Sequence, residues 1–233
     1  MTKAIAVIPA RGGSKRVPKK NVMDFMGKPM IAWTIEAALR SNVFSRVLAS
    51  TDDKGIAEVA KQYGAEVPFL REGNSNDFTP VGEATVGAVK QAEDHWSEEY
   101  DVVVQLLSNC PIRNADDISV SYKQFCKSSP SFQISCFKFG WMNPWWATKL
   151  NCDYVPEFLF PEALKKRSQD LDDLYCPTGA IWIADKQALV DNKTFYGPGH
   201  IFYPIDWKSA VDIDDYEDLD FAKAVFLLNE SER

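Results

Sequence analysis

A group of cationic residues follows directly after the first apolar segment of the chain. Residues 4–8 form a continuous apolar run, and residues 9–21 then read PARGGSKRVPKKN. The two glycines allow backbone N–H groups to come close to an anion, and amides arranged in this way bind phosphate oxygens. Arg11 and Lys15 would add charge-assisted hydrogen bonds to a triphosphate. The alternative is a solvated basic loop, but five cations directly after a buried strand favour a small anionic ligand.

A pair of aspartates near the C-terminus is the second feature whose residue types could take part in chemistry. Residues 211–215 read VDIDD, and an extended backbone there would place Asp212 and Asp214 on one face. Two carboxylates on one side can bind a hard divalent cation, with phosphate oxygens and water completing its coordination. The neighbouring Asp215 and Glu217 are better explained as acidic residues at the start of a helix.

Polar residues also follow two other apolar runs. Residues 50–53 read STDD, and a carboxylate there could either join the site or cap the next helix. Residues 107–113 read LSNCPIR, in which Ser108 and Asn109 offer polar contacts. Arg113 could bind an anion or neutralise Asp116 or Asp117, and Arg71 could support the site or form a surface ion pair.

The hydrophobic pattern predicts the elements that must position these residues. Short apolar runs alternate with amphipathic stretches, which predicts a three-layer α/β/α sandwich with a mostly parallel sheet in one domain, residues 1–233. The expected strands are residues 4–8, 47–50, 67–70, 101–107 and 179–184, and the expected helices are residues 30–40, 53–63, 79–93, 116–127 and 216–228. Such sheets bind ligands at the carboxyl ends of their strands, where the polar segments fall.

Residues 130–175 interrupt this alternation. The segment contains Trp141, Trp145 and Trp146 and then the polar stretch KKRSQDLDD. We interpret it as an insertion that forms a lid, a dimerisation arm or both. The tryptophans favour a subunit contact over a sugar-stacking role.

Composition excludes several classes of function. The chain has 233 residues, a net charge of −7 and a pI of about 5.0, so nucleic-acid and membrane partners are not expected. No apolar run approaches the roughly 20 residues of a membrane helix. Five scattered cysteines without CxxC spacing indicate reduced thiols and a cytoplasmic location.

Together these motifs resemble those of the acylneuraminate cytidylyltransferase family, the CMP-sialic acid synthetases and their bacterial nonulosonate relatives. The resemblance covers nearly the whole chain, and IPARGGSKRVPKKN at residues 8–21 is its most specific part. Other matching segments are STDD at 50–53, YGAEVPFLR at 63–71, CPIR at 110–113, RSQDL at 167–171, PTGAIWIA at 177–184 and VDIDD at 211–215. The resemblance implies a nucleotide-diphospho-sugar transferase-like fold with an inserted dimerisation arm, and therefore a homodimer.

The resemblance also implies a reaction and the residues that carry it. In this family the anomeric hydroxyl of a nine-carbon 2-keto sugar acid attacks the α-phosphorus of CTP, pyrophosphate leaves, and a CMP-sugar forms. Mg²⁺ lies between the triphosphate and two aspartates that match Asp212 and Asp214. The implied catalytic residues are Arg11, Lys15, Asp212 and Asp214. The implied nucleotide-binding residues are Ala10, Arg11, Gly12, Gly13, Ser14, Lys15, Lys20, Asn21, Arg71 and Thr79, with Arg16 in support. The implied sugar contacts are Asn109, Arg167 and Gln169.

The sugar half of the site departs from the family pattern. Members that use sialic acid usually carry LLQPTSPLR at the end of the central strand, where this chain has QLLSNCPIR. Leu107 thus replaces a glutamine that contacts the sugar, and Asn109 replaces a threonine. RSQDL and VPFLR are closer to the pseudaminic acid branch, although its ATAPL-type strand end is absent. The expected acceptor is therefore a nonulosonic acid whose identity is open.

Two alternatives follow from the same residues. One is a cytidylyltransferase for another acid, such as a 3-deoxyoctulosonate, and the other is a non-catalytic nucleotide-binding protein with the same fold. Retention of Arg11, Lys15, Asp212 and Asp214 argues against a non-catalytic protein. A Rossmann dehydrogenase is disfavoured because GxGxxG is absent.

Overall fold

A six-stranded sheet forms the centre of the protein, which a computed structural model describes over residues 2–71 and 80–231. The strand order is β10–β6–β9–β5–β1–β4, and β9 is antiparallel to both of its neighbours while the other pairs are parallel. The mostly parallel sheet is therefore confirmed. The strands are β1 (Ala4–Pro9), β4 (Arg46–Ser50), β5 (Val102–Gln105), β6 (Phe132–Lys138), β9 (Tyr175–Asp185) and β10 (His200–Pro204).

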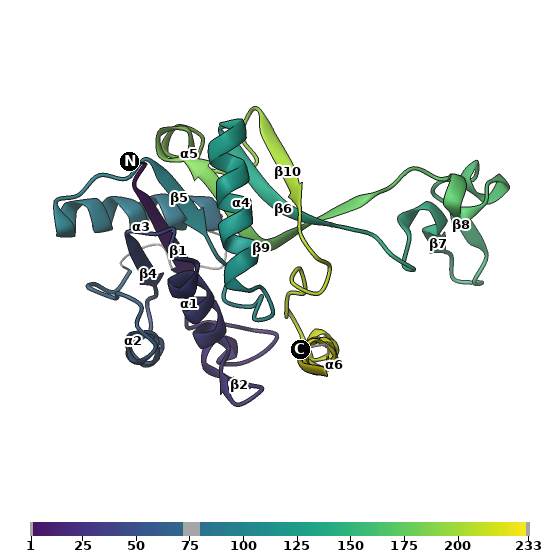
Figure 1. Cartoon of the computed structure of the whole chain (residues 1–233). Helices are drawn as coiled ribbons and strands as arrows, with labels where there is room; N and C mark the ends of the chain where they lie inside the picture. The colour runs from purple at the N-terminus through teal and green to yellow at the C-terminus, as the bar shows by residue number, and fades with distance from the viewer. Residues whose placement is uncertain (1, 72–79, 232–233) are drawn as a thin grey trace.

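Helices cover both faces of this sheet and produce the three expected layers (Figure 1). Ala4, Ala6 and Ile8 of β1 share a core with α1, α2 and α4, whereas Ile5 and Val7 pack with α3 and α5 on the other face. Both faces of the strand are thus buried, which explains its continuous apolar sequence. The helices are α1 (Met30–Ser41), α2 (Lys54–Gln62), α3 (Val81–Trp96), α4 (Ala115–Ser128) and α5 (Lys186–Asn192). Within the described ranges, no helix has the length and apolar character needed to cross a membrane.

Polar caps begin the helices that follow the ends of β4 and β5. The Asp53 carboxylate accepts a hydrogen bond from the Ile56 N–H at 2.9 Å at the start of α2. Asn114 and Asp117 form a reciprocal capping box at the start of α4. Such caps satisfy N–H groups that have no partner within the helix, and each stabilises by about 1 kcal/mol. Helix capping is therefore the role of Asp53.

The expected strand at residues 67–70 is wrong. Only Glu66 bridges to the sheet, through a single parallel bridge to Leu48. Pro68 has no N–H to donate to a ladder, so the chain cannot continue as a strand of the sheet. Val67 is nevertheless buried in the core, which explains why the segment is apolar.

The C-terminal helix α6 (Tyr216–Ser231) packs beside the strand ends instead of covering the sheet. Its core includes Ile213, which directly precedes the helix and is fully buried. Other members of this core are Phe25, Met30, Ile112, Leu219, Ala222 and Val225. Phe25 comes from the short hairpin β2 (Asp24–Phe25) and β3 (Lys28–Pro29). This packing anchors the acidic segment next to the end of β5.

Residues 211–213 are not the expected strand. The Ile213 N–H donates to the Asn109 carbonyl at 2.9 Å, so the segment bonds to a loop and joins no ladder. The Asp215 carboxylate accepts hydrogen bonds from the N–H groups of Glu217 and Asp218, both at 3.0 Å. The interpretation of Asp215 as a helix-start residue is therefore confirmed.

An arm formed by residues 139–174 extends away from the sheet between β6 and β9 (Figure 1). It contains the hairpin β7 (Thr148–Leu150) and β8 (Pro156–Phe158). The predicted insertion at residues 130–175 begins too early, because β6 lies inside the main sheet between β10 and β9. Apolar side chains are exposed along the arm, and Trp141 and Tyr154 retain 86% and 81% of their surface.

We expect Gly82→Ala to destabilise the protein by about 1–3 kcal/mol, although alanine normally favours a helix over glycine. An added Cβ at Gly82 in α3 would stand 2.5 Å from the Lys193 carbonyl oxygen. Gly87 lies in the same helix with nothing within 4 Å of an added Cβ, so Gly87→Ala should stabilise by up to about 1 kcal/mol. Thermal unfolding measures both effects, and a gain in both variants would contradict the close approach of α3 to Lys193.

Candidate active site

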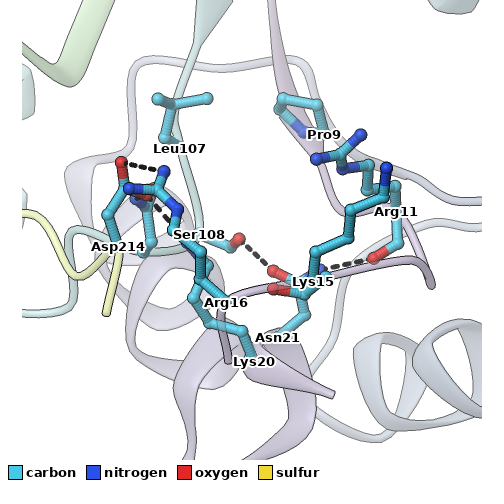
Figure 2. A pocket seen from close by; sticks show the side chains of 11 residues that line it. Pro9, Arg11, Lys15, Arg16, Lys20, Asn21, Leu107, Ser108 and Asp214 are labelled. Atoms are coloured by element: carbon cyan, nitrogen blue, oxygen red, sulfur yellow. Dashed lines mark hydrogen bonds and ion pairs between the residues drawn. The ribbon is translucent and has the colours of Figure 1, made fainter. Parts of the chain in front are cut away.

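A cavity of about 410 Å³ lies at the carboxyl ends of β1 and β5 (Figure 2). It is bordered by the basic loop (residues 9–21), the strand-end loop (residues 107–113) and Asp214. Its lining residues are Pro9, Arg11, Ser14, Lys15, Arg16, Lys20, Asn21, Leu107, Ser108, Asn109 and Asp214. Four of them are cations, so the cavity concentrates positive charge in a chain of net charge −7. This local field suits a polyphosphate ligand.

Asn21 fixes the basic loop to the strand-end loop. Its Nδ2 donates to the Arg11 carbonyl at 2.8 Å, and its Oδ1 accepts from Ser108 Oγ at 2.5 Å. Both Asn21 and Ser108 are buried. A buried polar atom without its partner costs about 1–3 kcal/mol, so these bonds hold the two loops at a fixed separation.

Asp214 faces the cations across the cavity. Its Oδ2 accepts from Arg16 Nη2 at 2.7 Å, and its Oδ1 accepts from Lys20 Nζ at 3.0 Å. Lys20 Nζ also donates to the Ile213 carbonyl at 2.7 Å. The Lys20 side chain is 15% exposed and that of Arg16 is 65% exposed. Arg16 is therefore the cation that a phosphate can more easily draw away from Asp214.

The two aspartates of this segment have opposite pKa shifts. Desolvation of the Asp212 carboxyl by the surrounding protein, followed by the charges of Asp214 and Asp218, raises the pKa of Asp212. Burial alone would raise the pKa of Asp214 as well, but its hydrogen bonds and ion pairs with Lys20 and Arg16 outweigh burial and lower it. Asp214 is thus the carboxylate that its cationic partners neutralise, whereas the charge of Lys20 only partly offsets the effects that raise the pKa of Asp212.

Asp212 and Asp214 fit a magnesium ion in donor type but do not surround one. Within the described residues there is no group of three or more His, Cys, Asp or Glu side chains that could hold a metal ion. Mg²⁺ commonly uses one or two carboxylates and takes its other ligands from water and substrate phosphates. Desolvation of the Asp212 carboxyl, followed by the negative charges of Asp214 and Asp218, raises the pKa of Asp212, and a bound cation would oppose these effects. The pair therefore suits a metal ion that is bound together with phosphate groups.

The structure brings half of the predicted nucleotide and catalytic residues to one place. Six of them line the cavity, namely Arg11, Ser14, Lys15, Lys20, Asn21 and Asp214, and the predicted sugar contact Asn109 lines it as well. Ala10, Gly12, Gly13, Arg71 and Asp212 do not line it. Ala10 is buried, and its N–H donates to the Ser50 carbonyl at 2.9 Å. Thr79 lies outside the described residues.

The predicted sugar contacts Arg167 and Gln169 lie on the arm and do not line the cavity of their own chain. Arg167 pairs with Asp170 at 2.7 Å, and Gln169 lines a separate cavity at the base of the arm with Trp141 and Trp146. The arm extends away from the strand ends, so these two residues are separated from the other predicted site residues (Figure 1).

Sequence reasoning missed the lining residue Pro9 and the role of Arg113. Pro9 directly precedes the basic residues of the cavity, and this adjacency was its only signal. Leu107, which stands where the family has a sugar-contacting glutamine, also lines the cavity. Arg113 is 1% exposed and bonds neither predicted partner: its Nη1 donates to the Ala180 carbonyl at 2.6 Å. Burial lowers the pKa of Arg113 to about 10. Arg113 therefore ties the strand-end loop to β9.

Comparison with a solved structure identifies the fold of the protein. The chain has the fold of CMP:2-keto-3-deoxy-manno-octonic acid synthetase complexed with CTP, with a TM-score of 0.71 over 98% of this chain and 100% of that chain at 18% identity. This likeness shows that the two chains share one fold.

The chain belongs to the cytidylyltransferase family, whose profile matches residues 5–143. It is 34% identical over 230 residues to the pseudaminic acid cytidylyltransferase of Campylobacter jejuni subsp. jejuni serotype O:2, which covers 97% of each chain. It is 35% identical to the CMP-N,N'-diacetyllegionaminic acid synthase of Legionella pneumophila subsp. pneumophila, with 82% of each chain covered. The expected family is therefore confirmed.

Asp212→Asn and Asp214→Asn should shift the melting temperature in opposite directions at pH 7 in the presence of a chelator. Asp212→Asn removes a carboxylate with a raised pKa, so we expect a gain of about 1–2 °C. The gain should fade as the pH falls through the pKa of Asp212, because the wild-type side chain then also becomes neutral. Asp214→Asn removes a carboxylate with a lowered pKa, so its loss should be largest at neutral pH and fade as wild-type Asp214 becomes protonated. Calorimetry across pH measures both, and shifts of the same sign would contradict the assignment.

Proposed function

We propose that the protein transfers CMP from CTP to the anomeric hydroxyl group of a nonulosonic acid and releases pyrophosphate. The observation that carries this proposal is the convergence of four cations and Asp214 on one cavity at the strand ends. Support for the acceptor class comes from the relative named pseudaminic acid cytidylyltransferase, which matches over 97% of both chains.

The proposed reaction forms one P–O bond and breaks another. The acceptor hydroxyl oxygen bonds to the α-phosphorus of CTP as the bond to the bridging oxygen of pyrophosphate breaks. Pyrophosphate leaves with the electron pair, and the hydroxyl proton passes to solvent. Negative charge grows on the leaving group, so Arg11, Lys15 and Arg16 are suited to neutralise it. Such transfers depend chiefly on positioning and charge neutralisation.

We propose Mg²⁺ as the cofactor, with Asp212 and Asp214 as its protein ligands. When bound, the ion supplies neutralisation of the triphosphate oxygens. Asp214 would hold the ion in place of its exposed ion pair with Arg16, which would leave Arg16 available to the phosphates. Lys20 retains its hydrogen bond to the Ile213 carbonyl, which keeps the acidic segment beside the cavity.

The basic loop is the proposed nucleotide site. Ser14, Lys15 and Asn21 line the cavity beside Arg11, and the backbone of Gly12 and Gly13 lets the chain turn closely around the phosphates. Ala10, Lys20, Arg71 and Thr79 complete the proposed nucleotide contacts. Asn109, which donates to the Ile213 carbonyl at 3.2 Å, is the proposed acceptor contact within the same chain.

Pyrophosphate release with CTP and Mg²⁺ tests the function against a panel of acceptors. The panel contains N-acetylneuraminic, legionaminic and pseudaminic acids, with deoxyoctulosonate as the competing acceptor class. We expect release with a nine-carbon acid and near-complete loss in Asp212→Asn, which should remain folded. Release only with deoxyoctulosonate would replace the acceptor class. If CTP binds but no acid in the panel gives pyrophosphate release, the transferase proposal would be contradicted.

We propose that the protein is a homodimer formed through the arm. The arm exposes many apolar residues, which a monomer in water would not be expected to leave uncovered. These include Trp141, Met142, Leu150, Tyr154, Val155, Phe158, Leu159 and Leu164. In a dimer the arm would also bring Arg167 and Gln169 to the partner's cavity, which would account for their distance from their own.

Val155→Asp should weaken this dimer, because it places a charge in the proposed apolar contact. Val155 is 57% exposed on the arm, and Val120 on α4 is a matched control at 50% exposure. Sedimentation equilibrium should therefore give a wild-type dimer, a dissociated Val155→Asp variant and a dimeric Val120→Asp variant. A wild-type monomer, or equal dissociation in both variants, would contradict an arm-mediated dimer.

A further inference from the structure

Two adjacent aspartates at the end of β4 have different partners. Asp53 turns forward and caps α2 through the Ile56 N–H at 2.9 Å. Asp52 turns back toward the neighbouring strand, and its Oδ1 accepts a hydrogen bond from the Gly12 N–H at 2.9 Å. β1 and β4 pair in parallel up to Pro9 and Ser50, so the loops that follow them leave the sheet side by side.

The Gly12 N–H and the Arg11 carbonyl belong to the same peptide unit. The carbonyl accepts from Asn21 Nδ2 at 2.8 Å, so the unit is held by Asn21 at one end and by Asp52 at the other. Because a peptide unit is planar and rigid, bonds at both ends fix its orientation. That orientation sets the direction of the Arg11 side chain before it and of the chain toward Lys15 after it.

The packing of Gly12 supports the same conclusion. An added Cβ at Gly12 would stand 3.1 Å from Asp53 Cβ and 3.1 Å from Asp53 Oδ2, whereas nothing lies within 4 Å of an added Cβ at Gly13. Gly12 is therefore the point at which the basic loop packs closely against residues 51–53, and the loop moves away from them at Gly13. Ser14 and Lys15, which follow, line the cavity.

We infer that Asp52 is a positioning residue that orients the basic loop for nucleotide binding, an inference that rests on the proposed function. Asp52 does not line the cavity and needs no contact with the ligand. A carboxylate near a triphosphate site is unfavourable by charge alone, so its contribution comes from the hydrogen bond it accepts. An asparagine at this position has a carbonyl oxygen that can accept the same bond.

Isothermal titration of CTP with Mg²⁺ into four proteins tests this inference. The proteins are the wild type, Asp52→Ala, Asp52→Asn and Asp53→Ala, and each melting temperature is measured in parallel. We expect Asp52→Ala to raise the Kd for CTP about tenfold, which is the size of a lost charge-assisted hydrogen bond. Asp52→Asn should bind as the wild type or slightly more tightly. Asp53→Ala should lower the melting temperature through loss of the α2 cap and leave the Kd unchanged.

Three results would overturn the inference. They are wild-type affinity in Asp52→Ala, tighter binding in Asp52→Ala, or equal weakening in Asp52→Ala and Asp52→Asn, which would assign the effect to charge. If Asp52→Ala also lowers the melting temperature, Asp53→Ala serves as the reference for that loss, and equal weakening of CTP binding in both variants would reject the inference. A wild-type protein that binds no CTP would overturn the proposed function and this role together, whereas normal wild-type binding isolates the role of Asp52.

Discussion

The buried hydrogen bond from Ser108 Oγ to Asn21 Oδ1 is the contact on which the arrangement of the cavity depends. It joins the loop after β1 to the loop after β5, which are adjacent parallel strands. The next residue, Asn109, joins the acidic segment to the same place, since its carbonyl accepts from the Ile213 N–H at 2.9 Å. Cations and carboxylates from three distant parts of the sequence therefore meet because two consecutive residues of one loop hold both partners.

This junction also explains how an acidic protein maintains a cationic cavity. Like charges crowded on one loop repel one another, and the repulsion falls when a carboxylate is placed among them. Asp214 supplies that carboxylate, but its bond to Arg16 is largely exposed, and exposed ion pairs contribute about 0–1 kcal/mol. A polyphosphate can therefore replace Asp214 as the partner of Arg16 at little cost. Lys20 is more buried and holds the Ile213 carbonyl, so it preserves the junction during such an exchange.

The residues that could be predicted from sequence are those whose chemistry is local. The basic loop, the carboxylate of Asp214 at the cavity and the Asp53 cap each follow from residue types within a few positions. β6 was missed because its sequence, FQISCFK, is too polar for a buried strand. In the structure, polar side chains of β6 are buried with hydrogen-bond partners. Gln133 Nε2 donates to the Ser121 carbonyl at 2.9 Å, and Ser135 Oγ donates to the Thr178 carbonyl at 3.1 Å. Such long-range partners cannot be seen in a single sequence, and the same is true of Arg113 and the Ala180 carbonyl.

The apolar edge of the cavity at Leu107 depends on a contact that a single sequence does not reveal. Leu107 packs against β9 at Gly179. An added Cβ at Gly179 would stand 2.3 Å from Leu107 Cδ1, which is far inside van der Waals contact. Leu107 and Gly179 are therefore coupled: a larger residue at 179 requires a smaller or displaced residue at 107. Leu107 cannot donate or accept a hydrogen bond through its side chain, so this edge can exclude water but cannot pair with a hydroxyl group. The cationic side of the cavity suits a charged ligand, which residue types reveal, whereas the edge at Leu107 depends on shape, which arises only when β5 and β9 are brought together.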